Sequence, residues 1–281
     1  MNLTSFLADD DVPVVLITGC SSGIGEATAI RFSQEGYRVV ATMRNLVGVS
    51  ETLKAALKAD GGHKMLALDV DDGLSVRTAV TQVEEECGRI DVLINNAGIS
   101  SISSVEEIDM EEAKAVFETN VFGALRVTQE VILGMRERGD GTVVNVSSVA
   151  GRLVTAGHGI YAASKHALEA ITESLAIEIN QFGVRVILIE PGFISTAILG
   201  KVDSIILGNT PYVEHLSQLV SMYKEAQQTA DSPKAVADCI LNAVNDSSHK
   251  FRYVVGSGAQ RALDERKLLT DREWINKIPS K

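Results

Sequence analysis

The chain has 281 residues, of which 45% are hydrophobic and 22% are charged, and its formal net charge is -11 at pH 7. This length suits one large domain whose core needs no disulfide or metal to stabilise it. The acidic balance disfavours a nucleic-acid-binding protein, which normally carries a basic face, but it does not exclude an anionic ligand held locally.

The cysteines and the N-terminal residues indicate where the protein is expected to work. Cys20, Cys87 and Cys239 are far apart and odd in number, which predicts neither a disulfide framework nor a metal site. The opening residues, MNLTSFLADDDVP, lack the basic and apolar regions of a signal peptide. No apolar run reaches the roughly 18 residues that a transmembrane helix needs. These features predict a reduced, cytoplasmic protein.

Short apolar runs recur along the chain and predict buried strands. Most are continuous blocks of Val, Ile and Leu rather than alternating patterns, as is typical of strands covered on both faces. The seven predicted strands are residues 14–18, 38–42, 64–68, 91–95, 141–147, 184–190 and 252–256.

Helical patterns lie between these strands. Residues 23–36 predict a helix that is closed by Gly36. Asp109 and Glu112 form a start signal for a long helix, and Ser232 with Pro233 form another, with Ser at the N-cap and Pro at the first helical position. The two longest predicted helices are residues 110–137 and 160–182.

The alternation of strands and helices predicts an α/β fold. Right-handed crossovers give a single Rossmann-like, doubly wound domain over residues 1–281, with a seven-stranded, mostly parallel sheet and helices on both faces. Residues 193–230 interrupt the alternation. A long insertion of this kind predicts a substrate lid, and a loosely packed surface excursion is the alternative.

A glycine-rich loop follows the first strand directly and precedes the first helix. Its spacing is G-x-x-x-G-x-G. Glycines permit a tight turn and close backbone approach, so that N–H groups at the helix start can face a pyrophosphate. The serine hydroxyls add donors. The predicted cofactor-binding residues of this loop are Gly19, Ser21, Ser22, Gly23, Ile24 and Gly25.

The end of the second strand predicts which nucleotide is preferred. An acidic residue here would bind the adenosine ribose hydroxyls of NAD. The sequence instead has Thr42 and Met43, followed by Arg44. An arginine suits a ribose 2′-phosphate because its planar group donates two charge-assisted hydrogen bonds. NADP(H) is therefore predicted over NAD(H).

Four motifs in a fixed order show that the sequence resembles the short-chain dehydrogenase/reductase family. They are TGCSSGIG at 18–25, NNAG at 95–98, a serine pair followed by YAASK at 161–165, and PG at 191–192. The resemblance covers about residues 12–260. Within the family, the chain looks most like the branch that contains 17β-hydroxysteroid dehydrogenases and retinol dehydrogenases.

The resemblance implies a catalytic set for hydride transfer to a carbonyl. Tyr161 would be the acid, or the base in the oxidative direction. Its ordinary pKa near 10 is too high for a base at pH 7, so a nearby cation would have to lower it. Lys165 lies four residues on, on the same helix face, and would lower that pKa and bind the nicotinamide ribose. Ser148 would orient the substrate, because it precedes Tyr161 by the family's 13 residues, which leaves Ser147 to pack at the strand end. Asn120 would interrupt the helix over 110–137 and help place a water relay to Lys165.

The resemblance also implies cofactor contacts at the carboxyl ends of later strands, where ligands of such sheets bind. Asp69 and Val70 follow the third strand and would contact adenine. The other implied contacts are Asn95, Ala97 and Gly98 after the fourth strand, and Pro191, Gly192, Ile194 and Thr196 after the sixth.

Apolar residues near the catalytic set predict a hydrophobic ketone, aldehyde or secondary alcohol as substrate. His158 could hydrogen-bond a distal polar group or could be a loop histidine without a chemical task. The candidate substrate residues, besides Ser148 and Tyr161, are Leu153, Val154, His158, Phe193, Ile198 and Leu199.

Two other functions compete with this one. The first is a catalytically silent NADP(H)-binding sensor or scaffold, which the intact set of Ser148, Tyr161 and Lys165 disfavours. The second is an enoyl-type reductase, disfavoured because its relatives space tyrosine and lysine by seven residues. No metal cluster is predicted, and the resemblance implies a homodimer or homotetramer.

Overall fold

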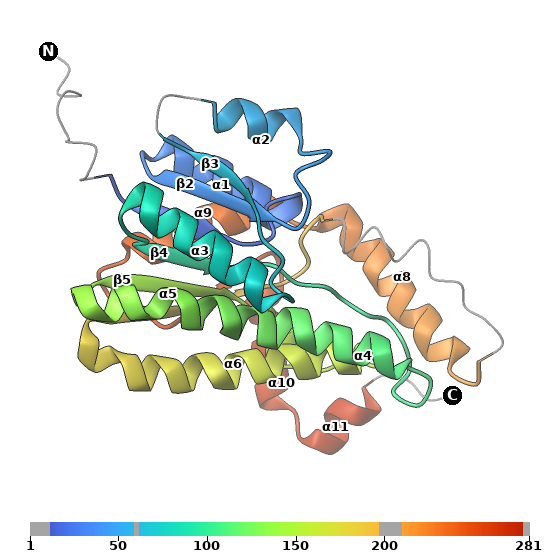
Figure 1. Ribbon diagram of the computed structural model, residues 1–281. Helices are drawn as coiled ribbons and strands as arrows, with labels where there is room; N and C mark the ends of the chain where they lie inside the picture. Colours follow the sequence, from blue (N-terminus) through green and yellow to red (C-terminus); the bar gives the residue numbers. More distant parts are fainter. Residues whose placement is uncertain (1–11, 59–61, 197–209, 278–281) are drawn as a thin grey trace, which may run out of the picture.

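A computed structural model describes residues 12–58, 62–196 and 210–277. Seven parallel strands form one sheet in the order β3-β2-β1-β4-β5-β6-β7 (Figure 1). The predicted doubly wound α/β fold is therefore confirmed, with a sheet that is fully parallel. The strands are β1 (Val14–Ile17), β2 (Arg38–Met43), β3 (Lys64–Ala67), β4 (Val92–Asn95), β5 (Gly141–Val146), β6 (Val184–Pro191) and β7 (Arg252–Val255).

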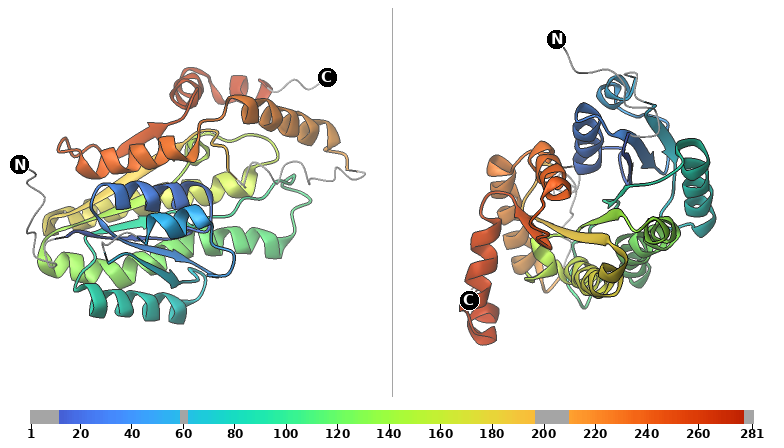
Figure 2. Two further views of the ribbon diagram at one scale, coloured as in Figure 1. Left: turned by 90° about the horizontal axis from the view of Figure 1, so that it is seen from above. Right: turned by 90° about the vertical axis from the view of Figure 1, so that its left-hand side faces the viewer.

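Helices cover both faces of the sheet, as the apolar character of both strand faces requires (Figure 2). One face packs against α1 (Gly23–Gln34), α2 (Glu51–Ala56) and α9 (Pro233–Asn245). The other face packs against α3 (Gly73–Cys87), α5 (Ala124–Arg138) and the last turns of α6 (Gly159–Ile179).

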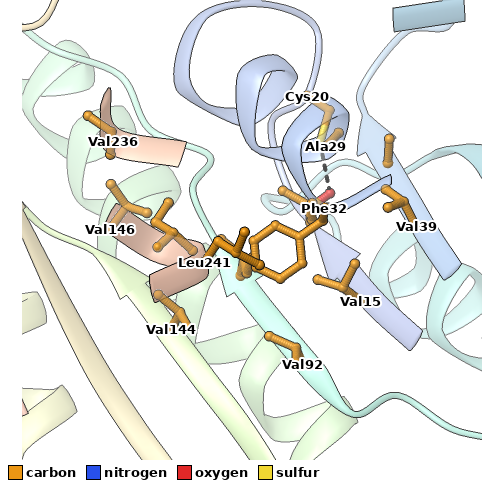
Figure 3. Close-up of a cluster of buried hydrophobic side chains, with 14 of the residues drawn as sticks. Val15, Cys20, Ala29, Phe32, Val39, Val92, Val144, Val146, Val236 and Leu241 are labelled. Atoms are coloured by element: carbon orange, nitrogen blue, oxygen red, sulfur yellow. Dashed lines mark hydrogen bonds between the residues drawn. The ribbon is translucent and has the colours of Figure 1, made fainter. Parts of the chain in front are cut away.

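The first of these two cores is centred on an aromatic ring from the helix after the glycine loop. Phe32 of α1 is fully buried among valines of the central strands and Leu241 of α9 (Figure 3). Cys20 is buried in the same core, and its thiol donates to the carbonyl oxygen of Ile17 at 3.3 Å. Burial raises the pKa of Cys20 to about 12, so this thiol is an uncharged core group.

The helix predicted over 110–137 is interrupted. It consists of α4 (Met110–Phe117), a π-helical turn (Glu118–Gly123) and α5. Asp109 caps α4 by accepting hydrogen bonds from the backbone N–H groups of Glu111 and Glu112. The π turn contains Asn120, the residue expected to interrupt the helix. Such turns often mark functional sites.

The C-terminal third differs from the sequence-based expectation in two places. The insertion over 193–230, predicted to be irregular, contains a 17-residue helix, α8 (Val213–Thr229). Two unpredicted helices, α10 (Ala259–Leu268) and α11 (Asp271–Asn276), follow β7. Among the described residues, α11 lies at the periphery, next to the C-terminal end (Figures 1 and 2). Ser232 is the N-cap residue of α9, but its side chain makes no cap hydrogen bond.

Candidate active site

The strand order reverses between β1 and β4, and a cleft of about 690 Å³ opens at the carboxyl ends of the strands. This is the position where open α/β sheets bind ligands. The glycine loop forms one end of the cleft. A Cβ on Gly25 would lie 2.3 Å from the carbonyl oxygen of Gly19, and Gly19 itself has a φ of +71°. Both positions therefore require glycine, and the loop leaves the start of α1 open toward the cleft.

The two asparagines of the NNAG motif face opposite ways. Asn96 lines the cleft and ties β4 to the glycine loop, because its amide donates to the carbonyl oxygens of Thr18 at 2.9 Å and Gly19 at 3.2 Å. Asn95 does not line the cleft. Its amide donates to Thr128 at 2.9 Å and Asn145 at 2.8 Å inside the core.

Asn95 was predicted to contact the cofactor at a point where the backbone approaches it, and that contact stays a prediction, although its side chain lies in the core. Asn96 was not predicted and lines the cleft. Neighbouring residues at a strand end point to opposite sides, so only one of the pair could face the cleft. Ala97 and Gly98 both line it, as expected.

The nucleotide end of the cleft carries the predicted polar groups. Arg44, Asp69 and Val70 line it, and Arg44 is exposed at the end of β2. Within the described ranges, Arg44 forms no salt bridge. Asp71 also lines the cleft and accepts a hydrogen bond from Thr119 at 2.9 Å. Burial raises the pKa of the Asp71 carboxyl.

Ser148, Tyr161 and Lys165 converge on the middle of the cleft. Ser148 begins a short 3₁₀ turn (Val149–Gly151) after β5, and its hydroxyl accepts from the N–H of Ala150 at 3.1 Å. Tyr161 and Lys165 lie one turn apart on α6, with the lysine Nζ 5.8 Å from the centroid of the tyrosine ring. The Nζ donates to the carbonyl oxygen of Val146 at 2.9 Å.

The pKa values of this set differ from the simplest expectation. Burial raises the pKa of Tyr161, and a hydrogen bond with Ser148 acts in the opposite direction. Burial lowers the pKa of Lys165 to about 8, opposed by the negative charge of Glu169. Lys165 was expected to lower the pKa of Tyr161. In the polypeptide by itself, desolvation of the phenol outweighs the effect of an ammonium that is 5.8 Å from the ring and bonded elsewhere.

Asn120 is buried beside this set without lining the cleft. Its side chain exchanges hydrogen bonds with both backbone groups of Ile99, at 2.8 and 2.9 Å, and donates to Ser164 at 3.0 Å. A Cβ on Gly98 would lie 3.2 Å from the Asn120 oxygen and 3.8 Å from the Lys165 Nζ. Asn120 therefore supports the backbone next to Lys165. Its part in a water relay stays a prediction.

The other predicted positions also fall at the cleft, with one exception among the glycines. Gly25 packs behind the loop and is not among the lining residues, whereas the rest of the loop set is. Ser147, assigned to packing, is buried and reaches the cleft wall. The remaining predicted residues in the lining are Leu153, Val154, His158, Pro191, Gly192, Phe193, Ile194 and Thr196. Ile198 and Leu199 lie outside the described residues.

A wall of the cleft that sequence reasoning missed comes from the C-terminal third. Trp274 of α11 donates its indole N–H to the carbonyl oxygen of Val154 at 3.1 Å. The cationic groups of Arg266 and Lys277 lie 5.5 and 5.2 Å from the centroid of its ring. The lining residues of this wall are His215, Gln218, Leu219, Met222 and Tyr223 from α8, and Ala262, Glu265, Trp274 and Lys277 from the C-terminal segment.

Known proteins are similar to this chain in sequence and in architecture. Residues 13–205 match the family described as short chain dehydrogenase. The chain belongs to the short-chain dehydrogenase/reductase family. Members of this family bind a nicotinamide cofactor and are oxidoreductases of alcohol and carbonyl groups.

Individual relatives place the chain within that family. It is 36% identical to retinol dehydrogenase 8 of Homo sapiens, over 85% of this chain and 79% of that protein. It is 35% identical to 17-beta-hydroxysteroid dehydrogenase type 1 of Homo sapiens, over 85% of this chain and 76% of that protein. The predicted resemblance to this branch is confirmed. The crystal structure of a short-chain dehydrogenase from Streptomyces avermitilis aligns with a TM-score of 0.79 and 32% identity, covering 96% of this chain and 99% of that one.

The described residues show neither a metal site nor a membrane-spanning helix. They contain no group of three or more His, Cys, Asp or Glu side chains placed to hold a metal ion. No helix in the described ranges is long and apolar enough to cross a membrane.

Proposed function

We propose that the protein is an NADP(H)-dependent oxidoreductase that interconverts an apolar ketone or aldehyde and the corresponding alcohol, with Tyr161 as general acid and base. The observation that carries this proposal is the convergence of Ser148, Tyr161 and Lys165 on the cleft that the glycine loop begins. Tyr161 provides a proton donor and Lys165 a cation on one turn of α6, and Ser148 provides a hydroxyl after β5. These are the groups that carbonyl reduction needs from the protein.

The residues of the cleft fit a dinucleotide. The Gly19–Gly25 packing keeps side chains away from the start of α1, where N–H groups can face a pyrophosphate. Gly98, beside Lys165 and Asn120, and Gly192 keep the backbone accessible at the catalytic end. When bound, the reduced nicotinamide supplies the hydride that reaches the carbonyl carbon.

The side chains divide the remaining work. Ser148 donates a hydrogen bond to the carbonyl oxygen and holds it beside Tyr161. Tyr161 gives its hydroxyl proton to that oxygen as the alcohol forms, and takes it back in the oxidative direction. Lys165, with a pKa of about 8, is mostly charged at neutral pH, so it stabilises the phenolate that remains.

Arg44 favours NADP(H) over NAD(H) as the cofactor. It is exposed, lines the nucleotide end of the cleft and forms no salt bridge in the described part of the chain. Its guanidinium can therefore bind a 2′-phosphate in two hydrogen bonds.

The substrate half of the cleft supports an apolar substrate such as a steroid, a retinoid or another hydrophobic carbonyl compound. Aliphatic and aromatic side chains make up the larger share of its lining, beside polar groups such as Gln218, Glu265 and Lys277. The names of the relatives given above, a retinol and a hydroxysteroid dehydrogenase, agree with this class. The principal apolar contributors are Leu153, Val154, Phe193, Leu219, Met222 and Trp274. We also propose that the segment 193–230, which carries α8, acts as the substrate lid.

A panel of hydrophobic ketones and aldehydes with NADPH tests this function, followed by the loss of reduced-nicotinamide absorbance. We expect turnover of at least one compound by the native protein and a loss of about 10²-fold or more in Tyr161→Phe. Binding of NADPH without turnover of any compound or of the corresponding alcohols would instead favour the silent sensor or scaffold.

The assembly is proposed to be a homodimer or homotetramer through the helices α4–α5 and α6. Phe122, Leu133 and Ile177 on these elements are 49%, 48% and 75% exposed. Apolar side chains on helices of the same region are a common basis of subunit contacts. Light scattering of the purified protein distinguishes a monomer from either assembly.

A further inference from the structure

His158, the residue before α6, turns its ring into the cleft instead of capping the helix. It is the N-cap residue of α6 but makes no side-chain cap hydrogen bond, and it is only 7% exposed. Its imidazole stacks on the ring of Tyr161, with centroids 4.8 Å apart and planes 26° apart. The imidazole is therefore in contact with the phenol that is proposed to transfer the proton.

Both ring nitrogens of His158 already have partners from other elements. The Nε2 lies 3.1 Å from the hydroxyl of Ser100, which follows β4. The hydroxyl of Tyr223, a buried residue of α8, lies 2.8 Å from the Nδ1 and 3.1 Å from the Nε2. A bond to a substrate at either nitrogen would have to replace one of these, so we interpret the imidazole as part of the protein's own network.

The imidazole of His158 is neutral at pH 7, and a neutral ring can hydrogen-bond with both of its hydroxyl partners. Burial lowers the pKa of His158 to about 4. A neutral imidazole has one N–H donor and one acceptor nitrogen, and each hydroxyl can donate or accept. Ser100 and Tyr223 can therefore satisfy either tautomer of the imidazole.

The backbone on the N-terminal side of His158 is fixed by the same two elements. Gly157 has a φ of +78°, and a Cβ there would lie 2.8 Å from Leu219 and 2.9 Å from Leu216, both on α8. Its carbonyl oxygen accepts from the N–H of Ser103 at 3.0 Å. The turn before α6 is thus packed between α8 and the segment after β4.

From this geometry we propose that His158 is a positioning residue for Tyr161, and that Tyr223 of α8 and Ser100 hold it in place. Through this network, the helix that walls the substrate cleft also fixes the orientation of the phenol. Tyr223 extends the same aromatic contacts to Phe193, whose ring centroid lies 5.3 Å away. The proposal rests on the proposed function only in assigning Tyr161 the proton transfer.

The kinetic test removes one hydroxyl from the network. Tyr223→Phe keeps the ring that packs on His158 and Phe193, so we expect the fold to persist and kcat to fall about tenfold, as small misplacements of catalytic groups do. The KM for NADPH should not change. Tyr212→Phe is the matched control, because this tyrosine at the start of α8 bonds Glu106 outside the cleft.

Substrate size separates positioning from direct substrate contact. Positioning predicts the same loss of kcat for a small ketone and for the largest ketone that the enzyme accepts. An increase in KM confined to the large substrate would contradict the proposal and make Tyr223 and His158 substrate contacts.

Conservative replacement and a double variant test the path through His158. Asn can donate and accept hydrogen bonds, so His158→Asn should retain more kcat than His158→Ala. If Tyr223 acts through His158, adding Tyr223→Phe to His158→Ala should cost little further kcat. Fully additive losses would overturn the proposed path.

A readout without turnover keeps this inference separate from the proposed function. NMR of protein carrying labelled tyrosine rings, with Tyr161 assigned by its absence in Tyr161→Phe, reports the titration of that phenol. Burial raises the pKa of Tyr161, so loosening its ring in His158→Ala or Tyr223→Phe should move the value toward 10. An unchanged titration contradicts the proposal even if the enzyme is active, and a shifted one supports it even if no substrate is turned over.

Discussion

Two parts of the chain build the cleft, and they differ in whether the family model matches them. Residues 14–196 supply the glycine loop, Arg44 and the catalytic set, and they lie within the 13–205 match to the family. The helices α8, α10 and α11 begin after that match ends and supply the opposite wall. The first part carries the proposed cofactor and catalytic residues together with Leu153, Val154 and Phe193 of the proposed substrate half, and the second part completes that half.

The difference follows from what each part must bind. A pyrophosphate, a ribose and a reacting carbonyl impose fixed distances, so the same residue types recur at the same spacings. An apolar substrate wall needs only shape and hydrophobic area, which many sequences provide. If this division is correct, substitutions of the cofactor and catalytic residues in the first part should change cofactor binding or catalysis. Substitutions in the second part should change substrate binding alone, except at Tyr223, which contacts His158.

Tyr161→Phe should have the largest effect on kcat and tests the catalytic role of the first part. The variant keeps the ring that stacks on His158 but has no proton to transfer, so kcat should fall by about 10²- to 10⁴-fold. NADPH affinity, measured by titration calorimetry, should stay near that of the native protein. Tyr37→Phe, which changes a tyrosine that bonds Asn245 far from the cleft lining, is the control. Activity within a few-fold of native in Tyr161→Phe would break the assignment.

The second prediction concerns the pH dependence of stability through His158, a residue of the first part that contacts Tyr223 of the second. His158 has a pKa of about 4 in the folded protein and about 6.5 when unfolded, so the unfolded chain binds the extra proton between these values. The free energy of unfolding is therefore reduced as the pH falls from 6.5 toward 4, and the stabilisation by neutral His158 is complete above 6.5. The full difference corresponds to about 3 kcal/mol.

Denaturant unfolding of the native protein and of His158→Asn at pH 7 and pH 4.5 measures this effect. Carboxylate contributions are common to both proteins and cancel in the comparison. We expect the native protein to lose about 2 to 3 kcal/mol more than the variant on acidification. Equal losses would mean that the imidazole is not buried in a neutral state.

Arg44→Ala should have an intermediate effect that is confined to the cofactor. Loss of a charge-assisted contact at an exposed site should raise the KM for NADPH about tenfold and leave the KM for NADH nearly unchanged. Arg77→Ala, on the exposed surface of α3, serves as the control for loss of one positive charge. Equal affinities of the native protein for NADPH and NADH would remove the basis for the NADP(H) preference.

The sequence was sufficient to predict the sheet and most of the residues that the first part contributes to the cleft lining. Continuous apolar runs are typical of strands buried in a parallel sheet, and the glycine and YAASK motifs can be recognised from the local spacing of their residues. Asn96 was not predicted to line the cleft, because a one-residue shift at a strand end reverses the side chain and the NNAG motif does not mark which asparagine faces the cleft. The Trp274 wall was missed because its contact with Val154 joins residues 120 positions apart, which no local pattern indicates.

Trp274→Ala is expected to have the smallest effect and tests the second part most directly. The indole packs over the cleft and bonds the backbone of Val154, so its loss removes apolar contact area from a large substrate. A loss of about 1 kcal/mol of binding free energy would raise the KM for that substrate about fivefold. The values of kcat and of the KM for NADPH should be unchanged, as should the KM for a small ketone.

Two neighbouring variants sharpen the result. Ile275→Ala changes an adjacent residue that is 73% exposed and outside the cleft lining, so its kinetics should match the native protein. Trp274→Phe keeps an aromatic ring but lacks the N–H, and its KM should fall between those of the native protein and Trp274→Ala. A loss of kcat in Trp274→Ala comparable with that of Tyr161→Phe would show that the C-terminal wall takes part in the chemistry, and the division between the two parts would then fail.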